Sequence, residues 1–179
     1  MKPVFLIGYM GCGKTTLGEV LARQLGVPFI DLDQYIERQM GFAIIDLFAM
    51  VGERRFREIE AKALREVAAK TGVVVGCGGG TPCYSDNMLV MNKAGITVWL
   101  TTSPERIAQR LCIPEHKTKR PKINNLPDVD ILPLVERELN DRSPYYGQAQ
   151  LQFDSTDIET GPDTEHTAQR LAAILESLN

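Results

Sequence analysis

One stretch constrains this chain more than any other, residues 8–15, which read GYMGCGKT. They fit the pattern G-x-x-x-x-G-K-[ST], the phosphate-binding P-loop. An apolar run at residues 4–7 precedes the motif, and residues 16–25 after it repeat apolar side chains at helical spacing. The motif requires this strand, loop and helix, because the loop N–H groups and the helix N-terminus together bind phosphate. The sequence therefore predicts a nucleotide site, against the alternative of a glycine-rich turn that binds nothing.

The P-loop residues also predict how ATP and a metal ion would be held. Lys14 would reach the β- and γ-phosphates, and the Thr15 hydroxyl would ligate Mg²⁺. The glycines allow backbone N–H groups to turn inward around the phosphates. Contacts to the nucleotide are therefore expected from Gly11, Cys12, Gly13, Lys14, Thr15 and Thr16.

Two carboxylates follow the second predicted strand, residues 27–30. Asp31 and Asp33 stand at the carboxyl end of that strand, where α/β proteins place ligands. One carboxylate would face the metal at the P-loop, and the other would face a second substrate. The alternative is a helix N-cap, a position that favours Asp. The neighbouring P-loop favours the functional interpretation.

Three consecutive glycines, residues 78–80, follow a third apolar strand at residues 73–76. A run of three is costly, because Gly loses more conformational freedom on folding than any other residue. The run is explained if a ligand must approach the backbone closely at the carboxyl end of the strand. A plain flexible turn is the alternative.

Two further segments carry charged side chains of interest. Arg57 and Glu60 are three residues apart on a predicted helix and share a face, which is typical of a solvated surface pair. Arg142 lies near the end of a helix predicted from residue 129, and residues 142–146 are expected to end that helix.

Residues 112–125 combine a basic cluster with two prolines and show no apolar stripe. The cluster contains Lys117, Lys119, Arg120 and Lys122. Lids that close over transferring phosphates carry this kind of charge, so the segment is predicted to be a mobile lid. A passive solvated loop is the alternative.

The bulk properties fit one globular domain. The chain has 179 residues, of which 44% are hydrophobic and 24% charged, and its net charge of −3 gives no general case for binding nucleic acid or an anionic membrane. No apolar run approaches the length of a membrane span, and the chain opens on a strand, so a cytoplasmic location is expected. The four cysteines show no CxxC pair or zinc spacing and are expected to be reduced thiols.

Together these motifs resemble the shikimate kinase family, small P-loop kinases of the nucleoside monophosphate kinase-like fold. The resemblance covers nearly the whole chain and rests on the P-loop with Met10, Asp31-x-Asp33, GExxFRxxE at residues 52–60, the three glycines, Arg120-Pro121, and Arg142-x-Pro144-x-Tyr146. The alternation of strands and helices predicts an α/β fold with three α/β/α layers and a five-stranded parallel sheet. A single domain over residues 1–179 is expected, with a substrate-binding region at about 33–61 and a lid at about 112–125.

The resemblance implies an activity, the transfer of the ATP γ-phosphoryl group to the 3-hydroxyl of shikimate in aromatic amino acid biosynthesis. The implied catalytic residues are Lys14, Asp33 and Arg120. The implied shikimate ligands are Asp33, Arg57, Gly79, Gly80 and Arg142, with Glu60 orienting Arg57. Thr15, and Asp31 through water, would hold Mg²⁺. Arg110 would lie against the adenine, and Arg120 would meet the phosphates.

Two other functions compete with this interpretation. A gluconate kinase would share the architecture, and convergence of Arg57 and Arg142 with Asp33 would argue against it. A nucleotide-binding regulatory module without catalysis would not need the full set of Lys14, Thr15, Asp33 and Arg120. The expected partners are small-molecule substrates, with no nucleic acid and no membrane, and the chain is expected to be a monomer.

Overall fold

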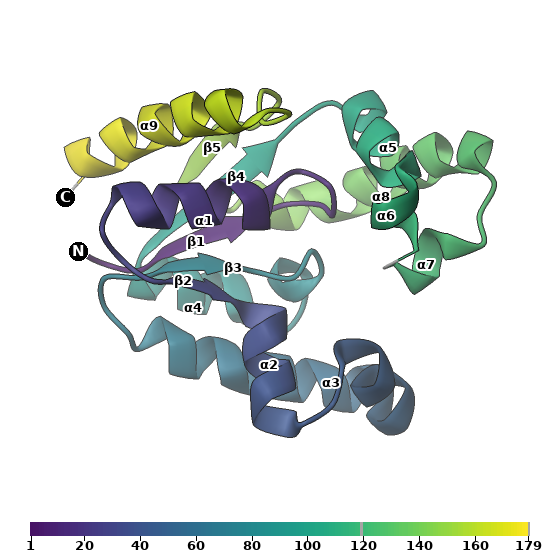
Figure 1. Ribbon diagram of the computed structural model, residues 1–179. Helices are drawn as coiled ribbons and strands as arrows, with labels where there is room; N and C mark the ends of the chain where they lie inside the picture. The colour runs from purple at the N-terminus through teal and green to yellow at the C-terminus, as the bar shows by residue number, and fades with distance from the viewer. Residues whose placement is uncertain (119, 179) are drawn as a thin grey trace.

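Five parallel strands form a single sheet at the centre of the molecule (Figure 1). The structure is a computed structural model and describes residues 1–118 and 120–178. The strands are β1 (Val4–Ile7), β2 (Phe29–Asp31), β3 (Val74–Gly76), β4 (Ile96–Thr101) and β5 (Leu151–Asp154), in the order β2-β3-β1-β4-β5. All four pairings are parallel, so the carboxyl ends of the strands share one edge. The predicted five-stranded parallel sheet is confirmed.

Helices cover both faces of the sheet. They are α1 (Lys14–Gln24), α2 (Leu32–Met40), α3 (Ile44–Ala68), the 3₁₀ turn η1 (Thr81–Cys83), α4 (Asn87–Ala94), α5 (Pro104–Cys112), α6 (Pro114–Lys117), α7 (Pro121–Asn124), α8 (Asp128–Tyr146) and α9 (Gly161–Ser177). Helices α1 and α9 lie together on one face, and α3 and α4 lie across the sheet from them (Figure 1). The three-layer α/β/α architecture is therefore also confirmed.

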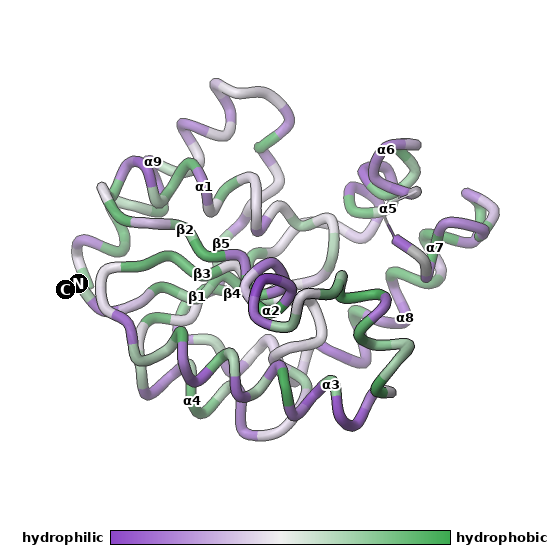
Figure 2. The backbone as a smooth tube through the Cα atoms, turned by 60° about the horizontal axis from the view of Figure 1, so that its bottom comes forward, coloured by the Kyte–Doolittle hydropathy of each residue, from purple (hydrophilic) through white to green (hydrophobic). Residues whose placement is uncertain are grey.

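The alternation of side chains along β1 builds two cores. Val4 and Leu6 pack in the cluster that includes α1 and α9, whereas Phe5 and Ile7 pack in the cluster that includes α3, α4 and α8. All four side chains are fully buried, as expected of a central strand covered on both sides. In Figure 2 the central strands of the sheet are coloured largely as hydrophobic.

Helix α8 ends within the segment that the sequence predicts. It continues through Pro144 and ends at Tyr146, the last residue of the segment 142–146 that was expected to end it. Pro144 has no N–H to donate to the carbonyl of Asn140, four residues earlier. The Ser143 hydroxyl donates to that carbonyl at 3.1 Å and replaces the missing hydrogen bond.

The predicted lid, residues 112–125, was expected to have no apolar packing, but one of its side chains is buried in the core. Within residues 112–125 the chain forms the short helices α6 and α7, and Ile123 is fully buried in the core cluster of α3, α4 and α8. One isoleucine among basic residues gives no periodic stripe, which is why the sequence pattern did not indicate an anchor. Lys119, part of the predicted basic cluster, lies outside the described residues.

Replacing this anchor should destabilise the protein. Ile123→Ala should lower the free energy of unfolding by roughly 2–4 kcal/mol, since a large side chain leaves a packed core. Val129→Ala is the matched control, because Val129 is 80% exposed. Urea denaturation measures both, and equal stability of the Ile123→Ala and Val129→Ala proteins would contradict the burial of Ile123.

Candidate functional site

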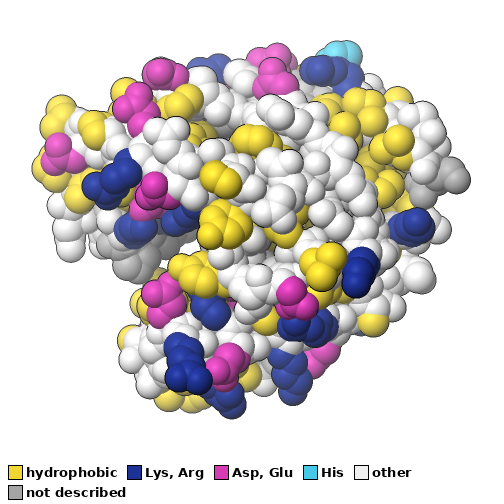
Figure 3. Space-filling view, turned by 180° about the vertical axis from the view of Figure 1, so that it is seen from behind, with side chains coloured by type: hydrophobic (Ala, Val, Ile, Leu, Met, Phe, Trp, Pro, Cys, Tyr) yellow, Lys and Arg dark blue, Asp and Glu magenta, His cyan; other side chains and the backbone are white. Residues whose placement is uncertain are grey.

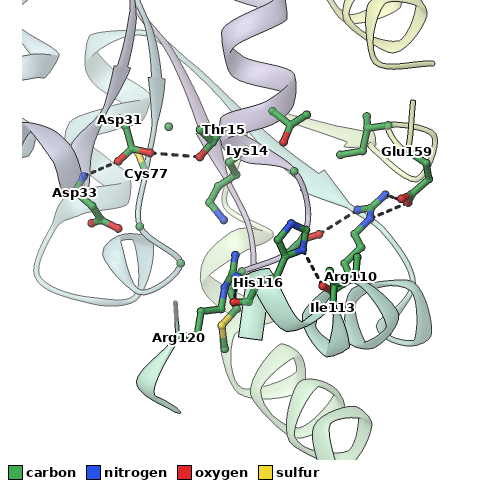
Figure 4. A pocket seen from close by; sticks show the side chains of 18 residues that line it. Lys14, Thr15, Asp31, Asp33, Cys77, Arg110, Ile113, His116, Arg120 and Glu159 are labelled. Carbon is green, nitrogen blue, oxygen red and sulfur yellow. Dashed lines mark hydrogen bonds and ion pairs between the residues drawn. The ribbon is translucent and has the colours of Figure 1, made fainter. Parts of the chain in front are cut away.

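A cavity of about 560 Å³ opens at the carboxyl edge of the sheet (Figure 4). The P-loop, the ends of β2 and β3, α5 and the predicted lid all contribute to its walls. The lining residues are Met10, Gly11, Gly13, Lys14, Thr15, Thr16, Asp31, Asp33, Gly76, Cys77, Gly78, Gly79, Arg110, Ile113, His116, Arg120, Ile158 and Glu159.

The P-loop leaves the N-terminus of α1 open toward this cavity. Gly13 is the N-cap residue with φ 95°, and no side chain caps the helix. The first N–H groups of α1 are therefore available to an anion, and the helix dipole favours negative charge there. The positive φ of Gly13 favours glycine, and an added Cβ would stand 2.0 Å from Ile158 Cδ1, so that side chain would have to shift. Cys12 does not line the cavity, and its side chain is buried in the core.

Lys14 lies inside the loop and is held by backbone oxygens. Its Nζ donates to the carbonyl oxygens of Gly8 at 2.8 Å and Tyr9 at 2.9 Å. The side chain points into the cavity (Figure 4). A positive charge is thus fixed beside the open helix terminus, where phosphate oxygens would be bound.

Asp31 caps a helix with one carboxylate oxygen and contacts the P-loop with the other. Its Oδ1 caps α2 by accepting from the N–H groups of Asp33 at 3.0 Å and Gln34 at 3.2 Å, while its Oδ2 accepts from Thr15 Oγ1 at 3.3 Å. A hydroxyl and a carboxylate therefore meet at the cavity wall. Mg²⁺ prefers oxygen ligands and commonly uses one or two protein oxygens together with phosphates and water, so this pair fits the ion.

The carboxyl group of Asp33, in the cavity wall, has a shifted pKa. Burial raises the pKa of Asp33 to about 6, and the neighbouring carboxylates of Asp31 and Glu60 add to the shift, whereas Lys14 opposes it. A carboxylate with a pKa near neutrality is a better proton acceptor at physiological pH than an ordinary aspartate.

The three glycines after β3 bring the predicted substrate residues together. A Cβ added at Gly78 would stand 3.0 Å from Asp33 Oδ1. At Gly79 it would stand 3.5 Å from Arg142 Nη1, and at Gly80 it would stand 2.9 Å from Arg57 Nη2. The turn therefore has one carboxylate and two guanidinium groups packed against its backbone. Arg57, Gly80 and Arg142 do not line the cavity itself. The two arginines lie beside the glycine turn, at the edge of the cavity.

Arg57 is fixed by a buried acid. Its Nη1 donates to Glu60 Oε2 at 2.9 Å, and Glu60, which is 1% exposed, also accepts from Thr81 Oγ1 at 2.7 Å. The Arg57 guanidinium lies 4.0 Å from the centroid of the Tyr84 ring. The pair is thus largely desolvated, and the interpretation of Arg57 and Glu60 as a solvated surface pair is wrong.

Arg142 is oriented from its own helix. Its Nη2 donates to Glu138 Oε2 at 2.9 Å, and its guanidinium lies 5.2 Å from the centroid of the Tyr9 ring. Tyr146, one turn further along α8, donates through its hydroxyl to the Gly79 carbonyl at 2.6 Å. These contacts hold α8 and the glycine turn together. The sequence did not indicate Glu138 or Tyr9, because an acidic helix residue and a variable P-loop position carry no signal of their own.

The opposite end of the cavity is built around Arg110. Its Nε donates to Glu159 Oε1 at 2.9 Å, its Nη1 to the Gly11 carbonyl at 3.0 Å, and its Nη2 to the Thr156 carbonyl at 2.7 Å. Because the N–H groups at the edges of the Arg110 guanidinium donate to protein oxygens, a ligand can contact only the flat face of this group. Ile158 and Glu159 line the cavity beside it, and sequence reasoning missed both because the segment carries no recognised motif.

Arg120 reaches the cavity from the predicted lid. It donates to the main-chain carbonyl of His116, and both residues line the cavity (Figure 4). His116 Nδ1 in turn lies 2.9 Å from the carbonyl oxygen of Arg110. The lid and the Arg110 end of the cavity are therefore connected through His116.

Comparison with known proteins identifies a family. A family model described as shikimate kinase matches residues 10–176. The shikimate kinase of Bacteroides thetaiotaomicron is 44% identical over 176 residues, covering 98% of this chain and 99% of that protein. A crystal structure of shikimate kinase from the same organism has a TM-score of 0.90 at 41% identity, covering 98% of both chains. Shikimate kinase from Acinetobacter baumannii in complex with shikimate has a TM-score of 0.83 at 29% identity, covering 100% of this chain and 95% of that one.

The raised pKa of Asp33 makes a prediction about stability. A folded pKa above the usual 3.8 means that the ionised carboxylate is less favourable in the folded than in the unfolded state, fully so above about pH 6. Asp33→Asn should therefore raise the free energy of unfolding of the ligand-free protein at pH 7, on the order of 1–3 kcal/mol. The gain should shrink as the pH falls from 6 toward 4, where the folded state is protonated.

Urea denaturation at pH 7 and pH 4.5 measures this gain. Asp141→Asn is the matched control, because Asp141 is exposed. A stabilisation by Asp33→Asn that is equal at the two pH values, or no stabilisation at all, would contradict a raised pKa.

Proposed function

The chain belongs to the shikimate kinase family, and we propose how its own residues carry out the family's reaction. Its activity is the transfer of the γ-phosphoryl group of ATP to the 3-hydroxyl of shikimate. The two substrates would meet over the carboxyl edge of the sheet, with the phosphates at the P-loop and shikimate at the glycine turn after β3.

The observation that carries this assignment is the packing of three side chains against three glycines. Arg57 and Arg142 present guanidinium groups at Gly80 and Gly79, and Asp33 presents its carboxylate at Gly78. Shikimate is a small triol carboxylate, so two guanidinium groups suit its carboxylate and Asp33 suits a hydroxyl. The backbone of Gly79 and Gly80 can approach the ring because no side chain intervenes.

Asp33 would accept a hydrogen bond from the reacting hydroxyl and assist its deprotonation. A pKa of about 6 leaves the group mostly ionised near pH 7 while keeping it basic enough to take a proton. Asp33 would therefore orient the attacking oxygen as well as activate it.

Lys14 and Arg120 would stabilise the charge that develops on the transferred group. Phosphoryl transfer depends mainly on positioning and on neutralising negative charge, and both cations line the cavity. Thr15 and Asp31 would hold Mg²⁺, directly and through water respectively, and the ion would supply further neutralisation of the phosphate oxygens. Arg110 would support the adenine with its guanidinium face, beside Ile158.

We extend the proposal to the organisation of the chain. Residues 1–179 would form one domain, with shikimate bound by a region at about 33–61 and a lid at about 112–125 that closes over the two substrates. The protein would act as a cytoplasmic monomer on small molecules. On the face shown in Figure 3 acidic and basic side chains are interspersed. Within the described residues, no helix combines the length and apolar character needed to cross a bilayer.

A coupled assay of ADP release tests the proposed substrate. ADP release with shikimate and dependence on a divalent cation are expected, whereas gluconate and other small hydroxy acids should give little. Faster turnover with gluconate than with shikimate would contradict the assignment of the glycine turn.

The two arginines at the glycine turn should act on shikimate rather than on ATP. Arg57→Ala and Arg142→Ala should each raise the KM for shikimate by roughly tenfold to a hundredfold, since each loses a charged hydrogen bond. The KM for ATP should change little. Arg55→Ala is the control, because Arg55 lies on the same helix with its side chain 67% exposed. Equal weakening of both substrates would refute this division of labour.

Arg120 should act mainly in the transition state. Arg120→Ala should lower kcat by roughly a hundredfold, in the range found when one donor to developing charge is removed, with a smaller change in KM. The exposed Arg137→Ala serves as the control. Unchanged kcat would show that the basic segment is a passive loop.

A further inference from the structure

Glu138 is a buried acid that the proposed reaction does not use. It lies on α8, one turn before Arg142, and is 6% exposed. Burying a carboxylate is costly unless its oxygens are paired, so a retained buried acid needs partners. Among the described residues Glu138 has three, and each comes from a different part of the site.

The three partners connect the P-loop, α8 and the lid. Tyr9, in the P-loop, donates its hydroxyl to Glu138 Oε2 at 2.9 Å, and Arg142 Nη2 reaches the same oxygen at 2.9 Å. Lys122, on α7, forms an ion pair with the other oxygen, Oε1. Lys122 is 55% exposed, so the lid contributes the most solvated member of the cluster.

The charges of this cluster bear on how strongly Arg142 attracts an anion. Glu138 alone would neutralise Arg142, because the two groups are in direct contact in a partly buried setting. Lys122 supplies a second positive charge to the same carboxylate. The net charge of the trio is then +1, and the Nη1 side of Arg142, which faces Gly79, keeps its attraction for a substrate carboxylate.

We propose that Lys122 and Glu138 form an electrostatic link through which the lid sets the affinity of Arg142 for shikimate. Glu138 is a positioning residue in this link, since it acts through Arg142. With Lys122 in contact, Glu138 orients Arg142 without cancelling its charge. Without that contact, the negative charge of Glu138 is compensated by Arg142 alone, and the affinity of Arg142 for the substrate carboxylate falls. This inference rests on the proposed role of Arg142 as a shikimate ligand.

The test is a pair of Lys122→Met substitutions, one in the natural background and one in a Glu138→Gln background. In the natural background, the KM for shikimate should rise by roughly three- to tenfold, as expected for coupled charges in contact. The KM for ATP and kcat should change by less. In the Glu138→Gln background, Lys122→Met should leave the KM for shikimate equal to that of the Glu138→Gln protein.

Lys117→Met is the matched control. Lys117 is another lid lysine, but it pairs with Asp128 rather than with Glu138. It should leave the KM for shikimate unchanged. Should the Glu138→Gln protein fail to fold, Lys122→Arg decides instead, because restoring the positive charge should restore the natural KM.

Three results would overturn the link. The first is an equal effect of Lys122→Met in both backgrounds, which would mean that Lys122 acts on the substrate directly. The second is no effect of Lys122→Met in the natural background, and the third is a Lys122→Arg protein as weak as Lys122→Met. Failure of the underlying assignment is distinguishable, because Arg142→Ala would then leave the KM for shikimate unchanged.

Discussion

Close approach of side chains to a bare backbone is the constraint on which the substrate side of this structure depends. At Gly80 a Cβ would stand 2.9 Å from Arg57 Nη2, and at Gly78 it would stand 3.0 Å from Asp33 Oδ1. Any larger residue would push these groups out of place or move the turn. The conformational cost of three glycines is therefore explained if charged groups and backbone converge there on a small ligand, as we propose.

The parallel sheet explains why the two substrate sites are adjacent. The P-loop follows β1 and the glycine turn follows β3, and these two strands are direct neighbours in the sheet. Asp31 ends β2 and Asp33 follows it, on the other side of β3. The P-loop, the glycine turn and the two aspartates, for which we propose binding of phosphate, shikimate and metal, thus come from three neighbouring strand ends. Helix α8 completes the site from the other face, with Arg142 held by Glu138 and with Tyr146 bonded to Gly79.

The sequence was most informative where a motif requires a particular backbone. The P-loop and the three glycines could be predicted because both depend on glycine, the P-loop for left-handed backbone at Gly11 and Gly13 and the glycine turn for the space that Asp33 and Arg57 occupy beside it. Asp31 was ambiguous in sequence for a physical reason, since one of its oxygens caps α2 while the other meets the Thr15 hydroxyl at the cavity. Glu138 and Ile123 could not be predicted. A helix acid is usually solvated, and one isoleucine in a basic stretch has no periodicity, so only the tertiary packing distinguishes them.

A crystal structure with shikimate and an unreactive ATP analogue would test the central claim most directly. The account predicts that the shikimate carboxylate lies between the guanidinium groups of Arg57 and Arg142, beside the backbone of Gly79 and Gly80. It also predicts that one ring hydroxyl lies within hydrogen-bonding distance of Asp33 and faces the terminal phosphate. Shikimate bound away from the glycine turn, or with its carboxylate directed toward Lys14, would contradict the account.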